Sequence, residues 1–159
     1  MILIRRAQKL EDYQAMIPHF VVESEAQREE MVKELAEFMQ TKPQDLFVIQ
    51  AWKDGDLVGF IVAQNTSPDV VFIVQAWSKA QTFNVIDELY ARTINWANAN
   101  GRSKIDAITK RDVDTLYRRF GFVETGVVVR YEIKPKLTSA LVSKIKELMH
   151  GKPVQDPEE

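Results

Sequence analysis

The sequence predicts an α/β fold of the α+β kind, with helices flanking one mixed, mostly antiparallel sheet of about seven strands. Three observations lead to this class. Short apolar runs recur between turn residues, and Asp54-Gly55 between two such runs is a strong signal for a β-hairpin. Amphipathic stretches with apolar residues three or four apart predict helices before and after these runs. The order of these strands and helices along the chain is the third observation.

In the first half of the chain, the hydrophobic pattern predicts a strand, two helices and three antiparallel strands. Pro18 is expected to end or bend the first helix, and Ser24-Glu25-Ala26-Gln27 has the form of a capping box for the second. The expected elements are Ile2 to Arg6, Leu10 to Phe20, a helix that begins after Ser24 and stops before Pro43, Leu46 to Lys53, Leu57 to Ala63 and Val70 to Trp77. Val70 to Trp77 is the most apolar of these strands, which suits a central position in the sheet.

The second half is expected to begin with a long helix from Ser78 to about Asn98, which Asn100-Gly101 ends. A strand at Lys104 to Ile108, a short helix at Arg111 to Phe120, and strands at Phe122 to Thr125 and Val127 to Ile133 then close the sheet. These elements make residues 1–134 one domain. An amphipathic helix at residues 135–150 follows, which docks on this domain or on a second copy in a homodimer, and residues 151–159 form a flexible tail.

Composition excludes several functional classes. The chain has 159 residues, with 23 acidic and 21 basic side chains, so charge gives no reason to expect a nucleic-acid partner. It has no cysteine, and His19 and His150 lie far apart, so we expect no metal site. No apolar run is long enough to span a bilayer and the first residues do not resemble a signal peptide. We therefore expect a cytoplasmic protein without a membrane partner.

One motif carries a chemical hypothesis. In Leu116-Tyr117-Arg118-Arg119-Phe120-Gly121-Phe122, Leu116 and Phe120 share a helical face and Gly121 allows the chain to leave the helix. Tyr117 lies one residue off that face. Its phenol is therefore either a rim hydroxyl in water or a group that borders a functional site.

The motif at this place in the order of elements resembles the GNAT superfamily of acyl-CoA N-acetyltransferases, over about Met1 to Lys134. The resemblance implies a sheet that splays apart between its fourth and fifth strands and holds acetyl-CoA there. It implies that the pantetheine arm pairs with Val74, Gln75 and Ala76, and that the pyrophosphate lies at the start of the next helix. Tyr117 would protonate the departing thiolate after direct attack by an amine of a small molecule or peptide.

The pyrophosphate signature of the family, Gln/Arg-x-x-Gly-x-Gly/Ala, is only partly present. The best register here is the segment Gln81, Thr82, Phe83, Asn84, Val85 and Ile86. Asn84 and Ile86 replace the two small residues that let backbone amides approach a phosphate. Two interpretations stay open: an altered phosphate loop, or a helix capped through Ser78-x-x-Gln81 in a non-catalytic binding module without acetyl-CoA.

The other roles in the implied reaction have several candidates each. A general base is sought among Glu23, Glu25 and Asp69, each of which equally suits a solvated or capping carboxylate. Arg28, Arg130 and Tyr131 are candidates for acceptor contacts or ordinary surface positions. The segments expected to face the acceptor show no acidic cluster of the kind typical of polyamine binding.

Overall fold

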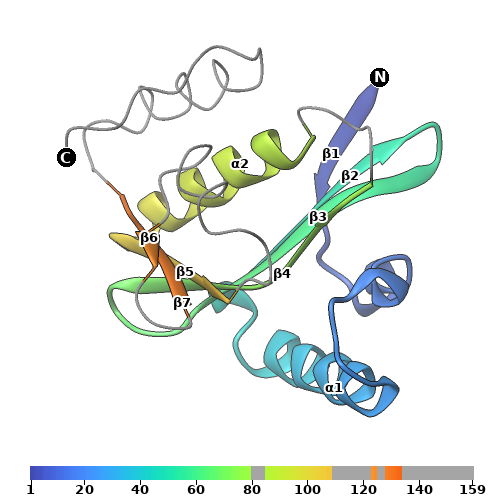
Figure 1. The fold of residues 1–159 in the computed structure, drawn as a ribbon, viewed down its shortest axis with the longest axis horizontal. Coiled ribbons are helices and arrows are strands. Elements are labelled where there is room, and N and C mark those ends of the chain that lie inside the picture. The colour runs from blue at the N-terminus through green and yellow to red at the C-terminus, as the bar shows by residue number, and fades with distance from the viewer. Residues whose placement is uncertain (80–84, 109–122, 125–127, 134–159) are drawn as a thin grey trace.

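The computed structural model describes residues 1–79, 85–108, 123–124 and 128–133, which form a seven-stranded sheet in the order β1-β2-β3-β4-β5-β7-β6 (Figure 1). Neighbouring strands are antiparallel except for β4 and β5, which run parallel. This confirms the predicted mixed sheet. The strands are β1 (Ile2–Arg6), β2 (Leu46–Lys53), β3 (Asp56–Asn65), β4 (Val70–Ser78), β5 (Lys104–Ile108), β6 (Val123–Glu124) and β7 (Val128–Glu132).

Helices cover the two faces of the sheet. Helix α2 (Val85–Ala99) lies on one face, and α1 (Glu25–Thr41) lies on the other beside the 3₁₀ turns η1 (Leu10–Tyr13) and η2 (Ile17–His19) (Figure 1). A third turn, η3 (Pro43–Asp45), links α1 to β2. Each face therefore buries its own apolar cluster, and β4, the middle strand of the sheet, contributes to both.

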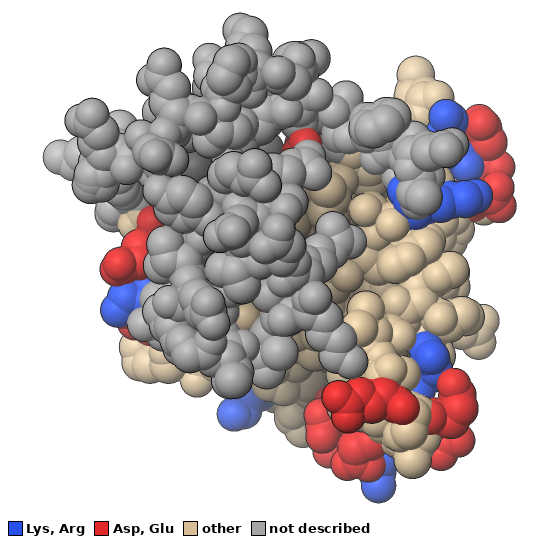
Figure 2. Space-filling model, viewed as in Figure 1, with Lys and Arg blue, Asp and Glu red and all other residues tan. Residues whose placement is uncertain are grey.

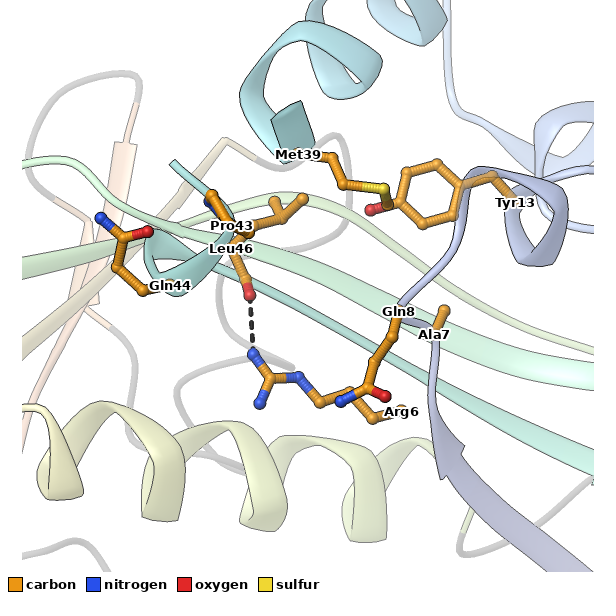
Figure 3. A pocket seen from close by; sticks show the side chains of 8 residues that line it. All are labelled: Arg6, Ala7, Gln8, Tyr13, Met39, Pro43, Gln44 and Leu46. Atoms are coloured by element: carbon orange, nitrogen blue, oxygen red, sulfur yellow. Dashed lines mark hydrogen bonds between the residues drawn. The ribbon is translucent and has the colours of Figure 1, made fainter. Parts of the chain in front are cut away.

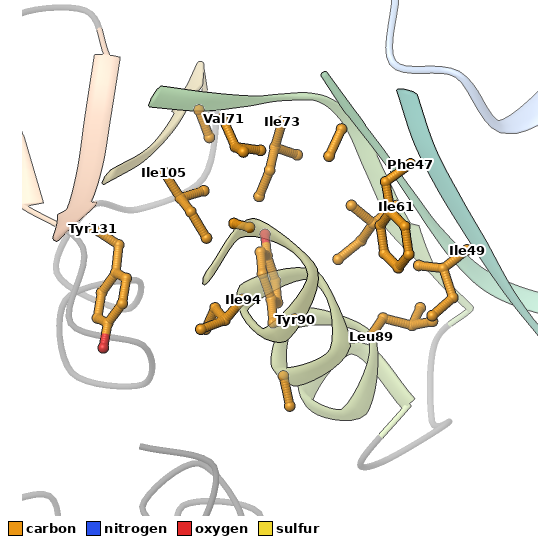
Figure 4. Close-up of a cluster of buried hydrophobic side chains, with 14 of the residues drawn as sticks. Phe47, Ile49, Ile61, Val71, Ile73, Leu89, Tyr90, Ile94, Ile105 and Tyr131 are labelled. Carbon is orange, nitrogen blue, oxygen red and sulfur yellow. The ribbon is translucent and has the colours of Figure 1, made fainter. Parts of the chain in front are cut away.

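The cluster beneath α2, here called the α2-side core, is almost wholly apolar. Leu89, Tyr90 and Ile94 of α2 point towards aliphatic side chains of the sheet, as Figure 4 shows. Leu89 is fully buried, and its sheet partners include Ile61, Ile73 and Ile105. The predicted inner face of this helix is thus confirmed at Tyr90, Ile94 and Ala97, all of which are buried.

The cluster beneath α1, here called the α1-side core, joins α1 and the 3₁₀ turns to the sheet. Leu35 is buried there, and the predicted stripe of Met31, Phe38 and Met39 packs against it. The predicted cap of α1 is confirmed, because the Ser24 hydroxyl accepts the amide of Gln27 at 3.1 Å. The Gln27 side chain in turn accepts the amide of Glu23 rather than that of Ser24.

Two expected helices differ from the structure. Leu10 to Phe20 forms two 3₁₀ turns instead of one helix, because Pro18 in the first turn of η2 has no amide to donate. The long helix does not begin at Ser78. Ser78 is the last residue of β4 and pairs with Gly59, while the amide of Lys79 donates to Val58 at 2.9 Å. Gln81, the other residue of the expected Ser78-x-x-Gln81 cap, lies outside the described residues, so the cap stays a prediction.

The turn predictions hold. Asp54 and Gly55 both have positive φ, 52° and 84°, as a tight hairpin between β2 and β3 requires. Gly101, with φ of 74°, follows the end of α2. The expected helix at Arg111 to Phe120, the helix at residues 135–150 and the tail at 151–159 lie outside the described residues. In the part of the chain that the structure describes, no helix combines the length and apolarity needed to cross a membrane.

Candidate active site

The ladder between β4 and β5 covers only the first part of β4. Val70 to Ile73 pair in register with Lys104 to Ala107, and the pairing stops there. β4 continues to Ser78, whereas Ile108 at the end of β5 pairs with Val128 of β7. Among the described strands, none pairs with the β5-facing edge of β4 beyond Ile73. The sheet therefore opens between its fourth and fifth strands, as the resemblance implied.

The backbone of β4 directs amide and carbonyl groups towards this opening, where a ligand can form hydrogen bonds with them. The hydrogen bond from the Lys79 amide to Val58 marks one hydrogen-bonded position of the antiparallel β3–β4 pair. Because such positions alternate, Trp77 exchanges hydrogen bonds with Phe60, whereas Ala76 and Ser78 occupy the non-bonded positions. The amide and carbonyl of Ala76 and Ser78 are therefore directed away from β3. An extended ligand can pair with an edge of this kind.

A β-bulge lies at the point where the opening starts. Ile73 pairs with Ala63 and Gln75 pairs with Val62, so Val74 is an extra residue in β4. The bulge interrupts the alternation of side chains. Ile73 belongs to the α2-side core, whereas Val74 packs against the α1-side core, and Ala76 returns to the α2 side. Bulges are often found beside active sites because they redirect side chains at one point of a strand.

Gln75 holds the chain segment between η2 and α1 against β4. Its side-chain carbonyl accepts the amide of Val21 at 2.7 Å, and its amide donates to the carbonyl of Val21 at 3.0 Å. The same amide lies 3.2 Å from the sulfur of Met31 in α1. Gln75 is 6% exposed, and these contacts pair its buried polar groups, as buried polar side chains normally require. Its side chain therefore positions a neighbouring segment, while its backbone pairs with Val62.

Aromatic residues from both sides of this segment meet at the end of β4. The His19 ring stacks on Trp77 with centroids 3.8 Å apart and an interplanar angle of 17°. Trp77 also lies against Phe60, with centroids 5.8 Å apart. Sequence reasoning missed the pairing of His19 with Trp77. The two lie far apart along the chain, and no local pattern links a 3₁₀ turn to the end of a strand.

The start of α2 sits directly on the sheet at Gly59. A side chain on Gly59 would meet Val85 Cγ1 at 2.8 Å and Leu89 Cδ1 at 3.2 Å, so only glycine fits without movement. Val85 is buried, and Ile86 packs against the α2-side core. Asp87 in the first turn is 1% exposed. The other residues of the proposed phosphate segment, Gln81, Thr82, Phe83 and Asn84, lie outside the described residues.

Tyr117 also lies outside the described residues, so its proposed role stays a prediction. Of the residues considered for acceptor contacts, Tyr131 is buried in the α2-side core, and this burial raises its pKa to about 12. Arg28 is committed to structure, because its guanidinium donates to the carbonyls of Ile17 and Phe20. The side chain of Arg130 lies outside the described side chains.

The three candidate bases fall in different places. Asp69 pairs with Lys104 at 3.0 Å and accepts a hydrogen bond from Ser103, at the beginning of β4 and away from the opening. Glu25 pairs with Arg28 at 3.2 Å in the first turn of α1 and is 81% exposed. Glu23 precedes the N-cap residue Ser24, close in sequence to Val21, which Gln75 holds against β4. Position therefore favours Glu23 over Asp69.

Acidic side chains gather over α1, as Figure 2 shows. In α1 and just before its N-cap, six glutamates are exposed, at positions 23, 25, 29, 30, 34 and 37. Helical spacing brings those in α1 together on the outer face of that helix, where Lys33 is also exposed. Within the described residues, no group of three or more His, Asp or Glu side chains is placed to hold a metal ion.

No family model matches the chain, and no curated protein sequence matches it. Solved structures do. The PaiA N-acetyltransferase of Thermoplasma acidophilum, solved with coenzyme A, is 16% identical, with a TM-score of 0.63 over 83% of this chain and 99% of that one. The ribosomal-protein-S18-alanine N-acetyltransferase of Escherichia coli is 14% identical, with a TM-score of 0.64 over 84% of this chain and 95% of that one.

A GNAT-family acetyltransferase of Streptococcus pneumoniae is 15% identical, with a TM-score of 0.58 over 84% of this chain and 100% of that one. Each of these similarities spans nearly the whole length of the other chain. The chain therefore has the fold of the GNAT acetyltransferases.

Proposed function

We propose that this protein is an acetyl-CoA-dependent N-acetyltransferase. The observation that carries the proposal is the end of the β4–β5 ladder at Ile73, with Ala76 and Ser78 directing backbone groups into the opening beyond it. The pantetheine arm of acetyl-CoA contains amide groups that can pair with such an edge. The solved complex of the similar PaiA structure with coenzyme A supports the choice of cosubstrate.

The reaction is direct transfer. An uncharged acceptor amine attacks the thioester carbonyl, a nitrogen–carbon bond forms, and the carbon–sulfur bond breaks. The amine loses one proton to a base, for which Glu23 is the best-placed candidate, and the CoA thiolate takes one proton from the phenol of Tyr117. This balances charge at both ends. Gln75 contributes by fixing Val21, and hence the segment that leads to Glu23, against β4.

Charge favours an acceptor that is a cation before it loses its proton. Six exposed glutamates cover α1 and the residue before its cap, and α1 contacts Gln75 through Met31. A surface of one sign raises the encounter rate of the opposite charge, and added salt weakens this effect. The similar E. coli structure acts on an alanine of a ribosomal protein, so a peptide amine and a small amine are both in the proposed class.

The test combines binding with turnover. Calorimetry with acetyl-CoA measures binding, and release of CoA thiol with a diamine or an alanine-initiated peptide measures transfer. Tyr117→Phe is expected to lower kcat by about 10²–10⁴-fold with little change in acetyl-CoA affinity, because only proton transfer is lost. Tyr90→Phe, on the buried face of α2, is the matched control and should retain activity.

One observation favours a second candidate function, a non-catalytic module. Asp87, buried in the first turn of α2, brings a carboxyl group to the positive end of that helix, and Glu88 beside it pairs with Arg92 at 3.1 Å. A pyrophosphate would compete with them for the same helix end. If calorimetry shows no heat with acetyl-CoA and no acceptor yields thiol release, the second candidate replaces the first.

A further inference from the structure

A cavity of about 300 Å³ lies at the β1–β2 end of the sheet. It is partly open to solvent and lies between the segment after β1 and the link from α1 through η3 to β2. Arg6, Gln8, Tyr13 and Gln44 bring polar groups to it, and Met39 and Leu46 bring apolar ones (Figure 3). The space equals roughly ten water volumes, which suits a small organic molecule. We call it the Arg6–Tyr13 cavity.

Tyr13 has an unusual environment in this cavity. Its side chain is 1% exposed, and its hydroxyl has no hydrogen-bond partner among the described residues. Figure 3 shows the Tyr13 ring among the residues that line the space. Burial raises the pKa of this phenol, so it keeps its proton and can only gain by donating it to an acceptor. A buried donor of this kind is normally satisfied.

Arg6 provides the charge. Its guanidinium donates to the carbonyl of Leu46 at 2.9 Å and lies 5.2 Å from the centroid of the Phe47 ring. These contacts fix its direction. They use one of the five N–H donors of the guanidinium, so further donors are available to a ligand. Arg6 also lies close enough to Tyr13 for its charge to act on that phenol.

Two carboxylates in the segments around the cavity, Asp12 and Asp45, accept hydrogen bonds from other groups, and the charge of Asp12 adds to the raised pKa of the Tyr13 phenol. Asp12 accepts the backbone amides of Gln8 and Lys9, each at 3.2 Å. Asp45 accepts the side-chain amide of Asn65 at 3.2 Å. Of the side chains that line the space, Arg6 alone carries a charge. The cavity therefore offers a cation and a neutral donor above apolar walls.

We propose that the Arg6–Tyr13 cavity binds a small carboxylate with a short apolar chain. The carboxylate accepts hydrogen bonds from the Arg6 guanidinium and the Tyr13 hydroxyl, which are the charge-assisted kind. The apolar chain lies against Leu46 and Met39. This site is separate from the proposed acetyl-transfer site, because β2 and β3 lie between β1 and β4 in the sheet. It does not depend on the proposed function.

The first test is an NMR titration of the ¹⁵N-labelled full-length chain with butyrate. Butyrate is expected to shift the amide signals of Ala7, Gln8 and Gln44 in a saturable way, with a Kd on the order of millimolar. Butyramide and n-butylammonium are matched probes with the same shape and a different charge. They should bind at least about tenfold more weakly. Equal binding of all three, or no saturable shift with butyrate, overturns the proposal and leaves a cavity that holds water only.

Variants then separate binding from folding. Arg6→Gln removes the charge and Tyr13→Phe removes the donor, and each should weaken butyrate binding by about tenfold or more. Tyr13→Phe should leave the Tm of the free protein unchanged or higher, because the hydroxyl that it removes has no partner among the described residues. Arg5→Gln is the matched control: Arg5 lies over Trp52 instead of the cavity, and this variant should bind butyrate normally. Normal binding by Tyr13→Phe would refute the assignment.

Discussion

The two faces of the sheet are built differently. On one face, α2 rests directly on β3 at Gly59 and seals a core of aliphatic side chains around Leu89. On the other face, α1 and the 3₁₀ turns are held by side-chain-to-backbone hydrogen bonds as well as by packing. Gln50 donates to the carbonyl of Asp12 at 2.7 Å, and Gln75 and Arg28 fix the segment around Val21.

The two faces are therefore expected to contribute differently to stability and to ligand binding. Apolar packing without gaps stabilises the fold strongly but leaves little room for a ligand. Directional hydrogen bonds stabilise less, yet they hold short irregular segments in one position and leave polar groups and a cavity beside them. We therefore expect stability to depend mainly on the α2 face, and binding specificity to depend mainly on the α1 face.

The strongest test of this division is Leu89→Ala on the α2 face. Leu89 is fully buried among aliphatic side chains, so the variant leaves a hole that rigid neighbours fill poorly. We expect the free energy of unfolding, measured with urea, to fall by about 2–5 kcal/mol. Met31→Ala, at a partly buried position on the α1 face, is the matched truncation and should cost clearly less. Equal losses would contradict the division.

Alkaline pH tests both faces at once, because each buries a phenol. Burial raises the pKa of Tyr131 to about 12 on the α2 face, and it also raises the pKa of Tyr13 on the α1 face. A raised folded-state pKa stabilises the protein fully below the unfolded value of about 10, and this stability is lost as pH rises towards and through 12.

For Tyr131 the loss corresponds to about 3 kcal/mol. Urea midpoints measured between neutral pH and pH 12 should therefore fall in the upper part of the range, and less so in Tyr131→Phe. Tyr13→Phe should reduce the remaining fall. A midpoint that stays constant through this range in the unaltered chain would show that both phenols reach water.

The architecture could be predicted from sequence wherever it rests on local patterns. Residues close in sequence determine three of the predicted features: the hairpin at Asp54-Gly55, the cap at Ser24 and the apolar stripe behind it. The structure has all three. The start of the long helix could not be predicted in this way. Ser78 carries a good capping pattern, but pairing with Gly59 across the sheet extends β4 through it.

The features of the candidate site likewise fall into those that the sequence predicted and those that it could not predict. The opening beyond Ile73 was expected from the order of elements and the resemblance that rests on it. The bulge at Val74, the contacts of Gln75 with Val21, and the stack of His19 on Trp77 join residues distant in sequence. Such contacts depend on how elements pack together, and no periodicity in a single sequence reports them.

Gly59→Ala tests how tightly α2 is seated, with a smaller expected effect. The new methyl group would lie 2.8 Å from Val85 Cγ1 and 3.3 Å from the carbonyl of Trp77, so the start of α2 must move away from β3. We expect a loss of about 1–3 kcal/mol in urea unfolding. Addition of Val85→Ala should recover part of this loss, because it removes the clashing atom. A purely additive double variant would place the strain elsewhere.

Gln75→Met tests the α1 face and should have the smallest effect on stability. The variant keeps the length of the side chain but leaves the amide and carbonyl of Val21 without their partners. Val21 is 52% exposed, so water replaces much of what is lost, and we expect a cost of about 1 kcal/mol.

The local effect should be larger than the global one. Hydrogen exchange at the Val21 amide should become much faster, while exchange at Leu89 in α2 changes little. Gln64→Met on β3, a half-exposed position, is the control and should leave Val21 protected. Unchanged exchange at Val21 in Gln75→Met would mean that packing, not this hydrogen-bond pair, holds the segment beside β4.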